Sequence, residues 1–156
     1  MEKAYFAAGC FWGVEDLFMK TEGVLKTAVG YMGGFDENPT YRKVCAGNSG
    51  HTETVELEFD PNKISYQELL EIFFSIHNPT TKNRQGPDIG SQYRSEIFTT
   101  TELQEKLANQ CIEKLTLENK FNDPIVTIIE TAKIFYRAED YHQQYFLKNG
   151  GGACGI

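Results

Sequence analysis

Apolar and polar positions follow two different periods along this chain, and the changes of period predict the order of its secondary structure. Alternating or short apolar runs predict strands, whereas spacings of three and four predict helices. The expected strands cover residues 3–8, 24–31, 52–59, 93–99 and 125–136, and the expected helices residues 10–20, 65–76, 101–119 and 138–148. Leu103 and Tyr141 are expected on the inward faces of their helices. Residues 80–92 are polar and predict a long loop, which in a compact domain is usually functional.

The expected strand 52–59 contains one carboxyl group on its apolar side. Val55, Leu57 and Phe59 share a face, and by the period of two Glu53 lies on that face as well. Burial disfavours the charged form of a carboxyl group, so a buried Glu53 would favour the neutral, proton-carrying form. The alternative is that Glu53 lies at the frayed end of the strand, in water.

Composition narrows the class of protein. A chain of 156 residues with 40% hydrophobic and 24% charged residues predicts one globular domain, and no linker or repeat divides residues 1–156. No apolar run is long enough for a membrane span or a secretory signal, so the expected location is cytoplasmic. With 15 basic against 22 acidic side chains the net charge is −7, which makes nucleic acid and membrane surfaces poor partners.

The four cysteines are Cys10, Cys45, Cys111 and Cys154. They form no Cys-x-x-Cys pair, and with three histidines they lack the spacing of a zinc site, so no metal is expected. Cys111 falls on the apolar stripe of a helix, where a cysteine usually acts as a small hydrophobic residue. Cys45 lies in an expected loop with no turn or helix end to activate it, and is interpreted as structural.

Cys10 differs because Gly9 predicts a turn that places it at the start of a helix. Free N–H groups and the positive end of the helix dipole stabilise a thiolate at such a position. Trp12 falls off the inward stripe of this helix and is interpreted as a wall of a small apolar pocket, whereas Phe11 fits either the pocket or the core.

Cys154 lies in a glycine-rich tail, residues 149–156, that has no periodicity and is expected to be flexible. An activated thiol and a mobile thiol can serve as a nucleophile and a resolving cysteine. The alternative for Cys154 alone is an inert cysteine in the tail.

The chain resembles the A-type peptide methionine sulfoxide reductases over nearly its whole length. The motifs that carry the resemblance are Gly9-Cys10-Phe11-Trp12-Gly13, Asn38-Pro39-Thr40-Tyr41, Gly50-His51-Thr52-Glu53, His77-Asn78-Pro79-Thr80-Thr81, Asp88-Ile89-Gly90-Ser91-Gln92-Tyr93-Arg94-Ser95 and Ala138-Glu139-Asp140-Tyr141-His142-Gln143-Gln144-Tyr145. The resemblance implies an α+β fold, a two-layer sandwich with a ferredoxin-like core, a mixed and mostly antiparallel sheet, and an extended C-terminus.

The resemblance also implies roles for individual residues. Cys10 would be the nucleophile, and Phe11 and Trp12 would hold the methyl group of the substrate. The sulfoxide oxygen would be contacted by Tyr41, Glu53 and Tyr93, in a pocket that Asp88 helps to shape. Cys154 resembles the first recycling cysteine of the family, and no cysteine follows it.

These roles predict reduction of methionine-S-sulfoxide, free or in proteins, through a Cys10 sulfenic acid and a Cys10–Cys154 disulfide. Thioredoxin would be the external reductant, with no metal or organic cofactor, and a monomer is expected. One alternative is a cysteine hydrolase or acyltransferase that pairs Cys10 with His51 or His142. Another is a non-catalytic protein that binds oxidised methionine.

Overall fold

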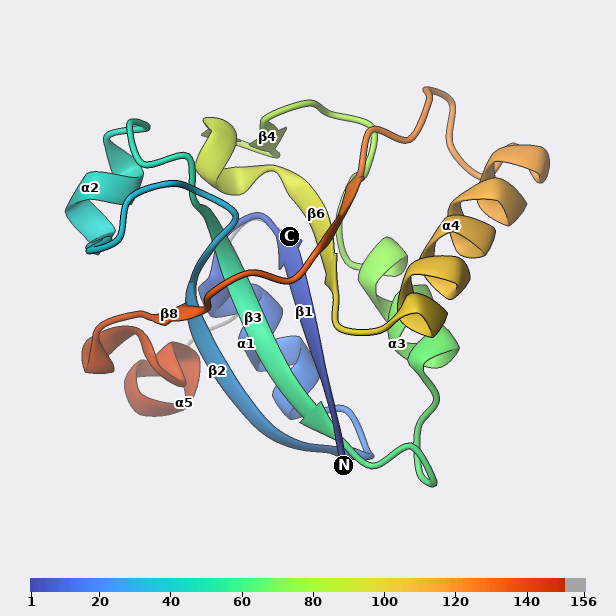
Figure 1. Ribbon diagram of the computed structural model, residues 1–156, viewed down its shortest axis with the longest axis horizontal. Coiled ribbons are helices and arrows are strands. Elements are labelled where there is room, and N and C mark those ends of the chain that lie inside the picture. Colours follow the sequence, from blue (N-terminus) through green and yellow to red (C-terminus); the bar gives the residue numbers. More distant parts are fainter. Residues whose placement is uncertain (151–156) are drawn as a thin grey trace.

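The fold is built around a six-stranded sheet with the strand order β7-β6-β1-β3-β2-β8 (Figure 1). The computed structural model describes residues 1–150. The strands are β1 (Glu2–Ala8), β2 (Val24–Met32), β3 (Thr52–Phe59), β6 (Ser95–Thr99), β7 (Ile128–Thr131) and β8 (Tyr136–Arg137), with β4 (Arg84–Gln85) and β5 (Asp88–Ile89) in a separate hairpin. The helices are α1 (Phe11–Met19), α2 (Tyr41–Cys45), α3 (Tyr66–Ser75), α4 (Glu102–Leu117) and α5 (Tyr145–Asn149), with 3-10 turns η1 (Ser91–Tyr93) and η2 (Asp140–His142).

The central part of the fold has ferredoxin-like topology. Chain order β1-α1-β2-β3-α3-β6 produces the antiparallel strand order β6-β1-β3-β2, with α1 and α3 on one face of the sheet (Figure 1). Only the added edge strand β7 is parallel to its neighbour, β6, within the described part of the chain. The expected α+β sandwich with a mixed, mostly antiparallel sheet is therefore confirmed.

The main core lies between the sheet and the helices α1 and α3. Phe6 of β1 stacks on Phe18 of α1 and on Phe73 of α3, with ring centroids 5.4 and 5.2 Å apart. The expected capping box opens α3, where Ser65 and Glu68 exchange side-chain and backbone hydrogen bonds. These contacts fix α1, and hence its first residues, against the end of the sheet.

The opposite face of the sheet is also covered. The connection from β7 to β8 crosses it (Figure 1), and Phe135 of this connection packs on Tyr5, with ring centroids 5.6 Å apart. Thr52 and Thr54 lie on the face opposite Val55, as expected, but both are fully buried. The alternation of residues along β3 is therefore as predicted. The side chains on its polar face are buried because the connection from β7 to β8, distant in sequence, covers that face.

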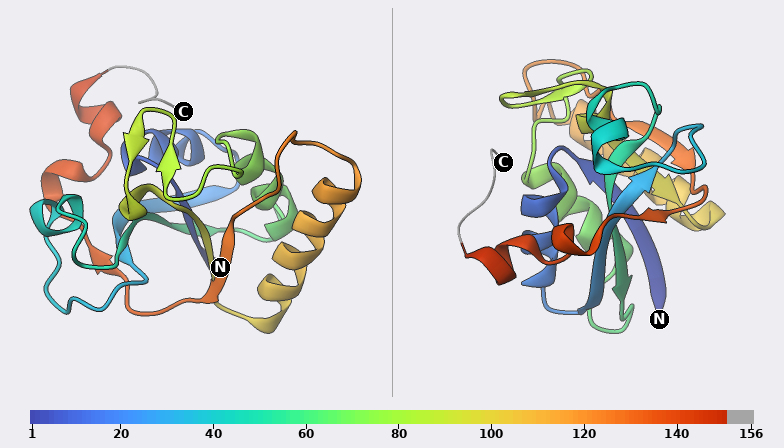
Figure 2. Two further views of the ribbon diagram at one scale, coloured as in Figure 1. Left: turned by 90° about the horizontal axis from the view of Figure 1, so that it is seen from above. Right: turned by 90° about the vertical axis from the view of Figure 1, so that its left-hand side faces the viewer.

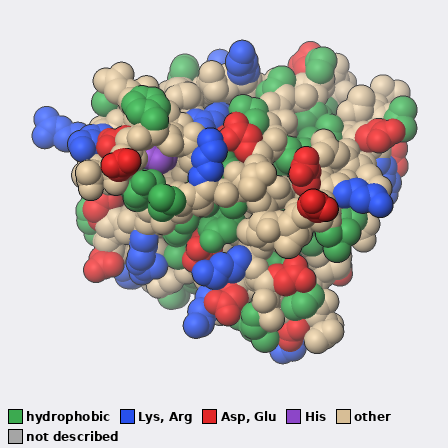
Figure 3. Space-filling view, in the orientation of Figure 1, with side chains coloured by type: hydrophobic (Ala, Val, Ile, Leu, Met, Phe, Trp, Pro, Cys, Tyr) green, Lys and Arg blue, Asp and Glu red, His purple; other side chains and the backbone are tan. Residues whose placement is uncertain are grey.

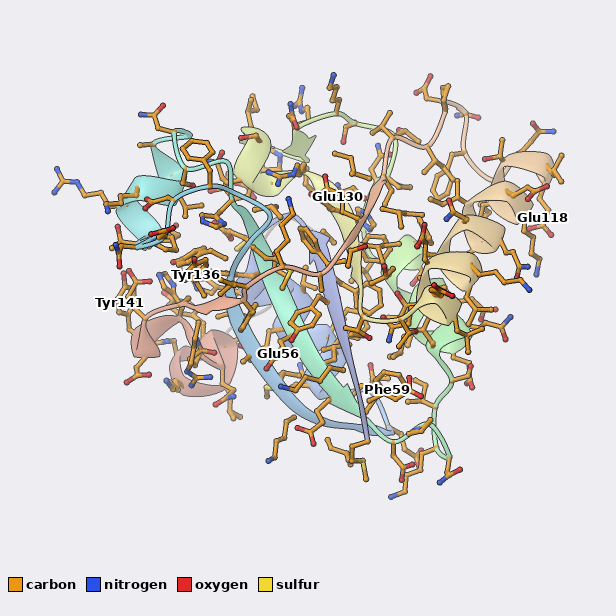
Figure 4. The ribbon with its side chains drawn as sticks, viewed as in Figure 1. Glu56, Phe59, Glu118, Glu130, Tyr136 and Tyr141 are labelled. Atoms are coloured by element: carbon orange, nitrogen blue, oxygen red, sulfur yellow. The ribbon has the colours of Figure 1, made fainter. Side chains whose placement is uncertain are left out.

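The expected helix over residues 138–148 is wrong. The structure has the turn η2, a break at Gln144 with φ of 48°, and only then the short helix α5. Tyr141 is 59% exposed and projects outward at the edge of the molecule (Figure 4), instead of facing the core. Leu103 is also exposed, because α4 turns Gln104 and Ala108 inward.

The surface shown in Figure 3 intersperses acidic and basic side chains, with no large patch of one sign on that face. Among residues 1–150, no helix combines the length and apolar character needed to cross a membrane.

Candidate active site

Cys10 lies at the N-terminus of α1, as the sequence predicts. Gly9 turns the chain with φ of +95°, and a Cβ atom there would lie 2.8 Å from Cγ of Gln85. Glycine is therefore required both for the backbone conformation and for the close packing. Cys10 is the N-cap residue and is half-buried. The thiol is thus at the N-terminus of a helix, where negative charge is favoured.

Glu53 joins β3 to the start of this helix. The residue is 2% exposed, and its Oε1 accepts a hydrogen bond of 3.1 Å from the backbone N–H of Phe11. The sequence prediction that Glu53 faces the buried side of its strand is confirmed. Burial favours the neutral carboxyl group, whereas the Phe11 amide favours the carboxylate. The Glu53 carboxyl group therefore bonds the residue that directly follows the candidate nucleophile, Cys10.

Tyr41 and Tyr93 lie near each other and near Glu53. Tyr41 begins α2, and Tyr93 ends η1. Burial is the largest cause that raises the pKa of both phenols, and the nearby Cys45 and Glu53 raise it further when they are ionised, so both hydroxyl groups keep their protons and can donate hydrogen bonds at neutral pH. Asp88 also contributes to the raised pKa of Tyr93, which places its charge close to this pair.

The Cys45 thiol lies between the two tyrosines. The residue is exposed as a whole, yet its thiol lies close enough to Tyr41 and Tyr93 to affect their pKa values, and partial burial raises its own pKa. Cys45 is the last residue of α2, not part of a loop. Its contacts arise from this short helix, which was not predicted from the sequence although Thr40 is a typical N-cap residue.

The two aromatic residues after Cys10 have different surroundings. Phe11 is 1% exposed and packs in the main core, with its ring centroid 5.8 Å from that of Tyr31. Trp12 is half-buried and stacks on Tyr145 of α5, with centroids 3.8 Å apart and planes within 6°. The indole N–H of Trp12 donates to Nδ1 of His142 at 2.9 Å.

Residues 138–145, here called the C-terminal strap, hold this arrangement together. Glu139 accepts hydrogen bonds from the Tyr31 hydroxyl at 2.8 Å and from the Tyr41 backbone N–H at 3.0 Å. The buried carboxylate of Glu15 accepts one from the backbone N–H of Gln144 at 2.7 Å. The strap thereby links β2, α2 and α1.

Gln143 fastens the strap to the edge of β2. Its side chain is 3% exposed; its amide oxygen accepts from the Val29 N–H, and its amide nitrogen donates to the carbonyl groups of Val29 and Ala138, each at 2.9 Å. The two bonds to Val29 join residues 114 apart in sequence, and they hold the strap along the edge of β2, where the chain does not continue as one helix.

Replacing Gln143 by alanine is expected to destabilise the protein by about 2–4 kcal/mol, because it leaves buried backbone groups without partners. The midpoint and slope of urea unfolding measure the change. The matched control is Gln110→Ala, since Gln110 is exposed on α4. Equal stability of the two variants would contradict the role of the Gln143 amide.

Neither candidate histidine forms a catalytic pair with Cys10. His51 uses both ring nitrogens, with Nδ1 accepting from the Gly34 N–H and Nε2 bonding the Asp36 carbonyl oxygen. His142 uses Nδ1 for Trp12, and its Nε2 has no hydrogen-bond partner in residues 1–150. The hydrolase alternative is therefore not favoured.

The structure thus places near the start of α1 seven of the eight site residues predicted from the sequence; these are Cys10, Phe11, Trp12, Tyr41, Glu53, Asp88 and Tyr93. Cys154 lies outside the described residues. Within residues 1–150, no group of three or more His, Cys, Asp or Glu side chains could hold a metal ion.

Known proteins share both the sequence and the fold. The family model described as "Peptide methionine sulfoxide reductase" matches residues 2–156. "Peptide methionine sulfoxide reductase MsrA" of Methanoculleus marisnigri is 56% identical, over 99% of this chain and 94% of that protein.

Solved structures of similar proteins have the same fold. The reduced form of Mxr1 from Saccharomyces cerevisiae has a TM-score of 0.92 and 36% identity, over 99% of this chain and 88% of that one. Mxr1 in complex with Trx2 has a TM-score of 0.66 and 26% identity, over 99% and 86%. With a match that includes both the helix of Cys10 and the strap, this chain belongs to the peptide methionine sulfoxide reductase family.

Proposed function

We propose that this protein, an oxidoreductase, reduces methionine-S-sulfoxide, free or within oxidised proteins, at the thiol of Cys10. The observation that carries the proposal is the position of Glu53, whose buried carboxyl group meets the first backbone N–H after Cys10. Two protonated phenols, Tyr41 and Tyr93, lie near that carboxyl group. The site therefore brings a favoured thiolate together with a proton source and two hydrogen-bond donors.

In the first step the Cys10 thiolate attacks the sulfur atom of the sulfoxide. Glu53 gives a proton to the oxygen, and the hydroxyl groups of Tyr41 and Tyr93 stabilise its negative charge. The oxygen passes to the Cys10 sulfur, so methionine leaves and a sulfenic acid remains. Phe11 and Trp12 would hold the methyl group, and Asp88 would polarise the pocket from the side of Tyr93.

In the second step the Cys154 thiol condenses with the sulfenic acid, forming a disulfide and releasing water. A thioredoxin-type dithiol then reduces the disulfide by exchange. The structure of the similar yeast protein Mxr1 with Trx2 supports such a partner. The cytoplasmic location, the monomeric state and the flexible tail of residues 149–156 stay predictions.

Replacing Cys154 by serine is expected to leave the first step intact and to prevent recycling by thioredoxin. The variant should release about one methionine per enzyme and then stop, because only the resolving thiol is lost. Intact-mass spectrometry after one turnover without reductant should find a gain of one oxygen atom in the variant and a loss of two hydrogen atoms in the wild-type protein.

The matched control for this experiment is Cys111→Ser, because Cys111 is half-buried on α4. This control should recycle normally. Multiple turnovers of Cys154→Ser with thioredoxin would contradict the resolving role. Complete absence of methionine release by the wild-type protein would instead favour a non-catalytic binder of oxidised methionine.

A further inference from the structure

His142 of the strap is enclosed by aromatic rings at the candidate site. The residue is 0% exposed. Its ring centroid lies 4.4 Å from that of Tyr41, 4.1 Å from that of Tyr141, 5.2 Å from that of Phe11 and 5.6 Å from that of Trp12. The ring thus contacts both residues expected to bind the substrate methyl group and one tyrosine expected to contact its oxygen.

The hydrogen bond from Trp12 defines the proton position on His142. An indole N–H can only donate, so Nδ1 of the histidine must present its lone pair and the proton must be on Nε2. That Nε2 is buried and has no hydrogen-bond partner in the described part of the chain. A buried donor without a partner is unfavourable, so stability alone does not account for a histidine here. The bond between Nδ1 and Trp12 therefore indicates what this histidine does.

Trp12 is held from two directions. Tyr145 covers one face of the indole, with 3.8 Å between centroids, and His142 holds its N–H. Both partners come from the C-terminal part of the chain, which Gln143 and Glu15 fasten to β2 and α1. Trp12 follows Cys10 by two residues, and its indole is the side chain expected to form one wall beside the attacking sulfur. Small errors in such positioning reduce catalytic efficiency strongly.

We propose that His142 is a positioning residue for sulfoxide reduction: its uncharged ring fixes the Trp12 indole in the orientation that binds the substrate methyl group, and protonation of the ring releases it. This inference rests on the proposed function. It assigns His142 no direct contact with the reacting atoms.

The surroundings of His142 determine when the ring becomes charged. Burial lowers its pKa below the ordinary value of 6.5, and the negative charge of Glu139 in the same strap partly offsets this. From α2 the ring faces Tyr41, and within the strap it faces Tyr141; both phenols have raised pKa values and stay neutral. From α1 it faces the uncharged Phe11 and Trp12. The ring is therefore neutral near pH 7, and the Trp12 bond is lost only on acidification.

Trp12 is the only tryptophan in the chain, so its fluorescence reports directly on this contact. Acidification of the wild-type protein should change the emission with one midpoint below pH 6.5, the ordinary histidine value. The transition should persist in Cys10→Ser, which excludes the neighbouring thiol as its origin. It should be absent from both His142→Phe, which keeps a ring, and His142→Asn, which keeps an uncharged acceptor. A wild-type emission constant over this range, or one that still titrates in both variants, would overturn the proposal.

Kinetics at neutral pH test the same link through substrate binding. His142→Phe should raise KM for methionine sulfoxide about tenfold, the size expected for one lost hydrogen bond, with a smaller change in kcat. His142→Asn should restore much of the affinity. Because Trp12→Phe already lacks the indole N–H, adding His142→Phe to it should cause little further loss.

Independent, additive effects of the two substitutions, or a wild-type KM in His142→Phe, would refute the positioning role. Failure of the proposed function is distinguishable from failure of this inference. A protein that reduces no sulfoxide but keeps the Trp12 titration refutes only the reaction, whereas an active enzyme whose Trp12 emission does not titrate refutes only the role of His142.

Discussion

Replacing Cys10 by serine is expected to abolish turnover of methionine sulfoxide. A serine hydroxyl ionises far less readily than a thiol at the same position, and the neutral hydroxyl is a far weaker nucleophile than a thiolate. The geometry of the turn is kept, because serine is close in size to cysteine and is favoured at the N-cap of a helix. Chromatographic measurement of methionine released over many enzyme equivalents provides the test.

Cys45→Ser serves as a comparison, because Cys45 lies close to Tyr41 and Tyr93 through a side chain that serine imitates. This variant should keep most of the activity while Cys10→Ser keeps none. Comparable turnover by Cys10→Ser and the wild-type protein would end the assignment of Cys10 as nucleophile.

Replacing Glu53 by glutamine is expected to lower the rate of methionine formation by a factor on the order of 10² or more, the usual contribution of a general acid. The glutamine oxygen can still accept the hydrogen bond from the Phe11 N–H, so the start of α1 should be kept. The substitution replaces the acidic O–H by an amide NH2 group, which cannot act as an acid in this pH range. Single-turnover measurement isolates this step from recycling by Cys154.

The matched control for Glu53→Gln is Glu56→Gln on the same strand. Glu56 lies on the opposite face of the sheet (Figure 4), where it accepts a hydrogen bond from the Tyr5 hydroxyl. The Glu56→Gln variant should reduce methionine sulfoxide at the wild-type rate. A near-normal rate in Glu53→Gln would transfer the role of proton donor to Tyr41 and Tyr93.

Sequence patterns predict those parts of this fold that are determined by interactions between residues close in sequence. The period of two over residues 52–59 placed Glu53 on the buried face, and the capping box at Ser65 located the start of α3. The glycine turn at Gly9 likewise located Cys10 at a helix terminus. Each of these features is determined by neighbours within a few residues in sequence.

The strap could not be predicted in this way, because its conformation depends on partners more than 90 residues away in sequence. Residues 138–148 have a helical pattern, yet the side chains of Glu139 and Gln143 bond residues of β2 and α2. For the same reason the positions of Cys45 and His142 at the site left no local signal. Only the resemblance of the strap to a family motif indicated that it mattered.

Figure 2 shows how α1 and α5, near opposite ends of the chain, lie together on one side of the molecule. This arrangement has a consequence for biosynthesis. The ribosome makes the nucleophile helix well before residues 138–145, which hold Trp12 and supply one of the bonds to Glu15, at about 5–20 residues per second. A nascent chain that stops before residue 138 can complete strands β1, β2, β3 and β6, but it lacks the His142 and Tyr145 partners of Trp12 and the Gln144 N–H that bonds Glu15. Catalytic competence should therefore appear only once the strap has been made, well after the central strands can form.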